Sequence, residues 1–126
     1  MTLAYWCVLI AALIPLVFAG IAKFGHPGFT NRSPRDFLEE LDGYRRRAHW
    51  TQLNSHEAFP PFAAAVIIAH LTGGNQNWID VLALGFIAAR ISYGFLYISD
   101  RPTSRSLAWL VGLICVVGLF VVAAAG

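Results

Sequence analysis

The stretch from Gly43 to Thr72 reads GYRRRAHWTQLNSHEAFPPFAAAVIIAHLT, and the interpretation of the whole chain depends on it. It opens with three arginines, is predicted to break at Pro60-Pro61, and ends in an apolar run of the kind that crosses a membrane. Asn54 and Glu57 lie where such a helix would be deep in lipid. An ionisable residue at that depth is costly, marks a functional site by default, and needs a partner. We therefore expect another helix to supply a partner for Glu57.

The composition indicates an integral membrane protein. Of the 126 residues, 57% are hydrophobic, which is too many for an ordinary soluble domain of this length. A span needs about 20 mostly apolar residues. Four stretches qualify, at residues 2–22, 48–71, 78–98 and 107–125. The sequence thus predicts one domain over residues 1–126, an all-α membrane protein built as a four-transmembrane-helix bundle in contact with membrane lipid, with no nucleic-acid partner.

The basic residues predict the orientation of this bundle. Eight of the nine fall in the two connections that four spans would place on one side: Lys23, Arg32, Arg35, Arg45, Arg46, Arg47, Arg101 and Arg105. By the positive-inside rule that side is cytoplasmic. Residues 23–47 then form a cytoplasmic loop, with a short interfacial helix that begins at Pro34, after Ser33 as N-cap, and extends to Asp42. Both termini are non-cytoplasmic, and residues 1–6 lack the positive charge of a signal peptide.

The depth of each polar residue in its span predicts a partner for Glu57. Glu57 and Arg90 each lie ten residues from the cytoplasmic ends of neighbouring antiparallel spans, and Asn54 and Tyr93 each lie seven residues in. Helical spacing places three polar residues on one face of each span: Arg47, Asn54 and Glu57 on the second, and Arg90, Tyr93 and Tyr97 on the third. We expect an ion pair between Glu57 and Arg90, within a polar stripe that also forms a binding site.

Metal and disulfide chemistry are not expected. His49 and His56 share a helical face, but no third residue stands at a ligand spacing. Cys7 and Cys115 are each alone in an apolar span.

Two motifs resemble those of the MAPEG family, the membrane-associated proteins of eicosanoid and glutathione metabolism. They read Asn54-x-x-Glu57-x-Phe59-Pro60-x-Phe62, after Arg47-Ala48, and Ala89-Arg90-x-x-Tyr93-x-x-x-Tyr97. The resemblance extends over about residues 31–109. It implies a four-helix protomer in a homotrimer, with glutathione as co-substrate bound between subunits towards the cytoplasmic side. It also implies that Asn54, Glu57, Arg90, Tyr93 and Tyr97 lie in or beside this site. We expect Arg47 to contribute to binding as well.

The chain departs from the family pattern at the groups that would activate the thiol. Active members usually carry an arginine four residues before the asparagine, where this chain has Trp50. Some members also place a ligand-contacting tyrosine where this chain has Ala58. The connection between the third and fourth spans covers only residues 99–104, so either Arg101 or Arg105 is the catalytic arginine or none is present.

Three functions remain open on the sequence. The first is a membrane-bound glutathione-dependent transferase or peroxidase acting on hydrophobic electrophiles or lipid hydroperoxides. The second is a catalytically silent member that binds lipid or a protein partner. The third is a small proton-coupled transporter using Glu57, against which stand the expected pairing with Arg90 and the lack of inverted-repeat symmetry. Compact loops and the lack of eukaryotic retention signals favour a bacterial inner membrane.

Overall fold

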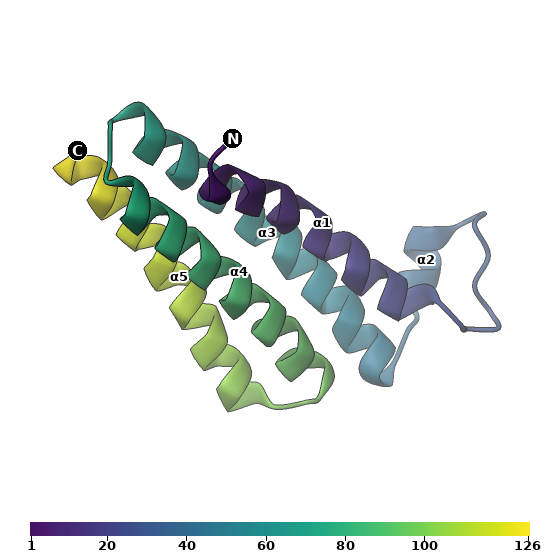
Figure 1. Ribbon diagram of the computed structural model, residues 1–126. Helices are drawn as coiled ribbons and strands as arrows, with labels where there is room; N and C mark the ends of the chain where they lie inside the picture. The colour runs from purple at the N-terminus through teal and green to yellow at the C-terminus, as the bar shows by residue number, and fades with distance from the viewer.

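The computed structural model describes all of residues 1–126 and is entirely helical, as the sequence predicts. In order along the chain, the helices are α1 (Leu3–Lys23), α2 (Pro34–Glu39), α3 (Gly43–Leu71), α4 (Gln76–Ile98) and α5 (Pro102–Ala125). The four long helices lie side by side as two pairs, α1 with α3 and α4 with α5, and the short α2 projects near one end (Figure 1). Both termini lie at the opposite end of the bundle.

Three of the four predicted spans satisfy the length and apolarity that a membrane helix requires. These are α1, α4 and α5, of 21, 23 and 24 residues, which at 1.5 Å per residue are about 32 to 36 Å long and can cross a hydrocarbon layer of about 30 Å. The chain is therefore an integral membrane protein. At 29 residues α3 is the longest helix, but its arginines and other polar side chains make it less apolar than the three candidate spans.

The core of the bundle depends on small residues that let the helices approach closely. Phe62 of α3 stacks on Phe86 of α4, with ring centroids 3.9 Å apart. Phe18 of α1 lies against Gly94 of α4 so closely that a Cβ at Gly94 would overlap the phenylalanine ring. All three phenylalanines of the core, Phe18, Phe62 and Phe86, are almost fully buried. The helices are thus held in a fixed register by the aromatic rings that fill the space between them.

Arginines satisfy the carbonyl groups at the ends of two helices. At the end of α1, Arg45 Nη1 donates to the carbonyls of Ala22 (3.2 Å) and Phe24 (2.8 Å). At the end of α4, Arg47 Nε donates to the carbonyl of Ile98 at 3.0 Å. A cation is favourable at both places because a helix C-terminus carries unpaired carbonyls and a partial negative charge. We call this the arginine end of the bundle.

A second polar cluster joins three helices at the opposite end. His70 Nε2 lies 2.8 Å from Thr2 Oγ1 at the start of α1. Asp80 Oδ1 accepts hydrogen bonds from the backbone N–H of Ala4 (3.0 Å) and from the side-chain amide of Gln76 (2.8 Å). The carboxylate therefore lies at the N-terminus of α1, where the helix dipole favours a negative charge.

Two local predictions need correction. Pro60 and Pro61 do not break the helix, since α3 continues through both. They remove two N–H donors, but the hydrogen bonds before and after them are enough for the helix to continue. The short α2 begins at Pro34 as expected but ends at Glu39 rather than Asp42, and the Ser33 side chain makes no capping hydrogen bond.

Candidate functional site

The candidate site is centred on Arg90, a buried arginine in the middle of α4. Its side chain is only 3% exposed. The one side-chain hydrogen bond that it makes runs from Nη2 to Oδ1 of Asn54 on α3, at 2.6 Å. A guanidinium has five N–H donors, so most of its donors remain available to a ligand. Because Asn54 is neutral, the positive charge of Arg90 is not compensated by this contact.

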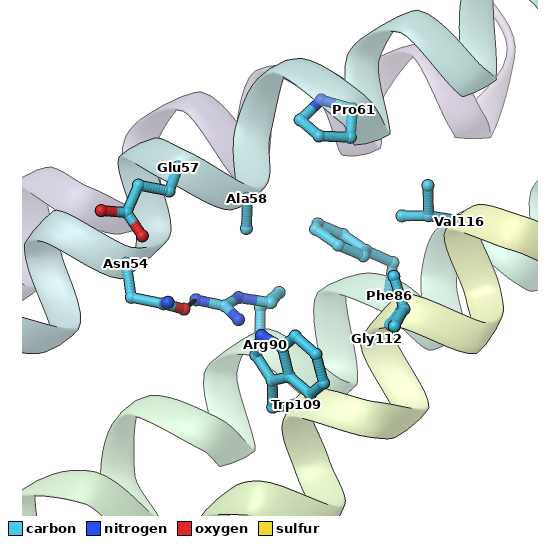
Figure 2. A pocket seen from close by; sticks show the side chains of 10 residues that line it. Asn54, Glu57, Ala58, Pro61, Phe86, Arg90, Trp109, Gly112 and Val116 are labelled. Carbon is cyan, nitrogen blue, oxygen red and sulfur yellow. Dashed lines mark hydrogen bonds between the residues drawn. The ribbon is translucent and has the colours of Figure 1, made fainter.

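The expected ion pair between Glu57 and Arg90 is not formed. Figure 2 shows the Asn54 amide, rather than the Glu57 carboxylate, meeting the guanidinium. Asn54 and Glu57 are three residues apart on an α-helix, so their side chains point in directions that differ by about 60° around the helix axis. Glu57 is consequently exposed at the side of α3, although it lines the same cavity as Arg90.

A row of alternating aromatic and cationic groups extends from Arg90 towards the arginine end. The guanidinium of Arg90 lies over the ring of Tyr93, 4.2 Å from its centroid. Tyr93 meets Tyr97 edge to face at 5.7 Å, and Arg105 of α5 lies over Tyr97 at 4.4 Å. The predicted shared face of Arg90, Tyr93 and Tyr97 is thus observed, and cation–π contacts hold both guanidinium groups in place.

Three adjoining cavities meet at Asn54. The deep cavity, of about 320 Å³, lies between α3, α4 and α5 and is lined by Asn54, Glu57, Ala58, Pro61, Phe86, Arg90, Trp109, Gly112, Leu113 and Val116. The Trp50 cavity, of about 380 Å³, is lined by Trp50, Leu53, Asn54, Glu57, Tyr93 and Tyr97. The Arg105 cavity, of about 240 Å³, is lined by Asn54, Tyr93, Tyr97, Arg105, Ser106 and Trp109. Together they form a hollow with cationic, anionic and apolar regions.

Most of the predicted site residues border this hollow, but two do not. Asn54, Glu57, Arg90, Tyr93, Tyr97 and Arg105 all line at least one of the cavities. Arg47 lines none of these three cavities, because its guanidinium is used at the end of α4. Arg101 is exposed at the N-cap of α5 and also lines none of them. Of the two arginines considered for thiol activation, the structure brings only Arg105 to the site.

Two tryptophans that the sequence motifs did not assign to the site also line these cavities. Trp50 lies 6.2 Å from Tyr97 and beneath the guanidinium of Arg46, which is 5.0 Å from its ring. Trp109 borders both the deep cavity and the Arg105 cavity. The spacing of four residues between Arg105 and Trp109 could have identified the second, since it places both side chains on one face of α5.

The hollow contains side chains of both charges but no cluster of metal-ligating groups. No group of three histidine, cysteine, aspartate or glutamate side chains is arranged to hold a metal ion. Arg90 and Arg105 can bind carboxylates or a thiolate, and Glu57 can bind an ammonium group. Glutathione carries all three kinds of group. The hollow therefore carries charged groups of both signs beside an apolar wall.

These features define a class of protein: an integral membrane helical bundle with a hollow, lined in part by charged residues, between its long helices. Comparison with protein families gives the particular family. The MAPEG family model matches residues 3–125, nearly the whole chain, and the protein belongs to the MAPEG family. No curated protein matches the sequence at a significant level. Membership in this family fits a glutathione-related transferase, peroxidase or related role.

Proposed function

We propose that the protein is a membrane-bound glutathione-dependent transferase or peroxidase acting on hydrophobic electrophiles or lipid hydroperoxides. The observation that carries the proposal is the state of Arg90, which is buried and bonded only to a neutral amide. A buried charge without a counter-charge is costly, so an anionic ligand beside Arg90 would be stabilising. Family membership supports glutathione as the source of that anion.

The surrounding residues suggest a division of roles in holding glutathione. Arg90 presents its unused donors to the deep cavity and would bind a carboxylate or the thiolate. Glu57, exposed on the rim of two cavities, would bind the amino group of the tripeptide. Asn54 would orient Arg90 through the bond that joins them. Tyr93 and Tyr97 would hold the guanidinium groups of Arg90 and Arg105 in position through cation–π contacts with their ring faces.

Arg105 is our candidate for activating the thiol. A cysteinyl thiol has a pKa of about 8.5, and a nearby cation favours the reactive thiolate. Arg105 lines the hollow, whereas Arg101 does not. The thiolate sulfur would attack either an electrophilic carbon, forming a thioether as the leaving group departs, or a peroxide oxygen. In the second case an S–O bond forms as the O–O bond breaks, giving a sulfenic acid and, after protonation, an alcohol; a second glutathione thiol would then displace water to form the disulfide. Both reactions need the same stabilised thiolate.

The proposed site also bears on assembly and topology. The Glu57 carboxylate is exposed on a single chain at a depth where lipid contact is costly. We propose that a neighbouring subunit of a homotrimer covers it, and that α3, which lies alongside the apolar helices, crosses the membrane as the fourth span. The arginine end would then be cytoplasmic and both termini non-cytoplasmic, in a bacterial inner membrane.

One substitution, at Glu57, distinguishes the proposed enzyme from a proton-coupled carrier. The expected pairing of Glu57 with Arg90 argued against a carrier, and that pairing is not formed. The remaining argument is the lack of inverted-repeat symmetry. Glu57→Gln would abolish proton-coupled transport, whereas in a glutathione enzyme it should mainly lower the affinity for glutathione.

The experiment that tests the function compares the two arginines before and within α5. Glutathione binding to detergent-purified protein would be measured by calorimetry, with oxidised glutathione and a thiol-free analogue as controls, and turnover would be measured with a model electrophile and a hydroperoxide. Arg105→Ala should abolish turnover, and Arg101→Ala serves as the matched control that should retain it. If wild-type protein binds no glutathione while remaining assembled, the silent lipid-binding or partner-binding alternative replaces the proposed enzyme.

A further inference from the structure

We propose that the deep cavity binds the second substrate end-on, with its reactive group beside Arg90 and its apolar body extending towards Val116. This inference rests on the proposed function for the identity of the reaction. It adds a substrate class, namely compact apolar molecules whose electrophilic carbon or hydroperoxide lies at one end.

The polar residues of the deep cavity are confined to one of its ends. Asn54, Glu57 and Arg90 lie together in Figure 2, and Pro61 and Val116 lie at the other end. No charged side chain lines that other end. If the apolar portion of a substrate fills the rest of the cavity, only a reactive group at the end of that substrate lies beside Arg90.

The apolar wall is rigid enough to select for size. Phe86 forms part of it, and its ring is stacked on that of Phe62 with an angle of only 6° between the planes. Phe62 is fully buried in the bundle core, and Val116 is also buried. Neither aromatic ring can move far without opening a void in the core, which is costly. The cavity should therefore discriminate between substrates by volume.

The cavity volume sets the scale of the apolar body. An apolar protein cavity of about 150 Å³ binds benzene. The deep cavity has about 320 Å³, so it should accept a bicyclic aromatic compound or an alkyl chain on the order of ten carbons. A long fatty acyl chain with its hydroperoxide in the middle would have to place apolar carbons on both sides of Arg90, where the polar residues leave no apolar wall.

The side of the cavity formed by α5 provides a route of entry from lipid. Leu113 and Trp109 both line the cavity and are each 43% exposed on the surface of the chain. Gly112, between them and the core, leaves room in the wall, since an added Cβ would stand 3.6 Å from Arg90 Cδ and 3.8 Å from Phe86. Substrate dissolved in the bilayer could therefore enter without crossing water.

The test is photolabelling of the full-length protein in phospholipid nanodiscs, which reads out binding without requiring turnover. The probe is a decanol derivative that carries a diazirine near its tail, and labelled residues are mapped by mass spectrometry. Labelling is expected to concentrate on Val116 and Phe86, to fall when cumene hydroperoxide competes, and to be weaker for an octadecanol analogue. A pattern spread evenly over the lipid-facing surface of α5 would overturn the inference.

A matched pair of variants identifies the cavity as the binding site. Leu113→Trp would fill the mouth of the cavity and lower labelling at Val116 by about tenfold. This is the loss expected when the new ring displaces about two methylene groups of the probe from the cavity. Leu110→Trp is the control, because Leu110 is 44% exposed on the same helix but does not line the cavity. If Leu113→Trp disturbs folding, Gly112→Ala provides a milder obstruction, with a smaller reduction expected. Equal labelling in all variants would refute the inference.

Calorimetry with glutathione on the same preparations separates the two proposals. Glutathione binding with diffuse labelling would retain the proposed function and reject the end-on pocket. Cavity labelling without glutathione binding would retain the pocket as an apolar ligand site and reject the glutathione chemistry.

Discussion

Replacing Asn54 by aspartate tests the role assigned to Arg90. The two side chains are nearly isosteric, so the new carboxylate would stand where the amide oxygen now lies, 2.6 Å from Arg90 Nη2. The variant would neutralise the guanidinium with an internal counter-charge. We expect the protein to fold at least as stably as the wild type and to bind glutathione much more weakly. These two effects have opposite signs, which distinguishes them from general damage to the site.

The size of the affinity loss follows from Coulomb's law. Unit charges about 4 Å apart interact with about 4 kcal/mol at an effective dielectric constant of about 20. An anionic group of the ligand next to Arg90 would meet repulsion of that order from the new carboxylate, partly reduced by solvent and relaxation. We therefore expect glutathione to bind about a hundredfold more weakly, equivalent to about 2.7 kcal/mol.

Asn54→Ala is the matched control, since it removes the hydrogen bond without adding a charge. Loss of a hydrogen bond to a charged group costs about 1.5–3 kcal/mol of stability, so this variant should unfold at a lower temperature. Its affinity for glutathione should fall less than that of Asn54→Asp, because the charge of Arg90 is retained. The measurements are calorimetric titration and thermal unfolding in detergent. If Asn54→Asp binds glutathione as tightly as the wild type, Arg90 does not hold the anion.

Three further substitutions test the packing and the helix ends. Gly94→Ala should lower stability by about 1–3 kcal/mol or more, because its Cβ would overlap the ring of Phe18; unchanged thermal unfolding would contradict this close approach. Arg47→Ala should lower the unfolding temperature by removing the bond to the carbonyl of Ile98, while glutathione affinity by calorimetry should stay within about twofold, and a large loss of affinity would return Arg47 to the binding site. Asp80→Ala should accelerate hydrogen exchange at the start of α1, and unchanged exchange there would show that the carboxylate does not hold that helix end.

The register between α3 and α4 could be predicted from the sequence because it depends on counting. Depths measured from the helix ends place Glu57 level with Arg90 and Asn54 level with Tyr93. The stacking of Phe62 on Phe86 and the bond from Arg47 to the carbonyl of Ile98 agree with that alignment. Helical periodicity likewise predicts which residues share a face, and the contacts from Arg90 through Tyr93 to Tyr97 follow it.

The choice between Asn54 and Glu57 as the partner of Arg90 could not be predicted in the same way. Both residues fall within the polar stripe, but a rotation of α3 by about 60° decides which side chain points at α4. That rotation is set by the packing of buried residues such as Thr51 and Ser55, each of which bonds to the backbone of its own helix. Opposite charge favoured Glu57 in the sequence analysis, and the rotation of the packed helix favoured Asn54.

The arginines before Ala48 show that one sequence signal can have two physical origins. Arg45 and Arg47 bind the ends of α1 and α4, and Arg46 lies over Trp50. In an antiparallel bundle of this kind α1 and α4 end on the same side, so their negative dipole ends meet at the place where α3 begins. Cations are required there by the fold itself, and the positive-inside rule counts the same residues as a marker of orientation. Arginines bound to helix ends are therefore explained by the fold, whichever side of the membrane they face. Independent support for the proposed topology must come from basic residues that bind no helix end, for which Lys23, Arg32 and Arg35 are the candidates.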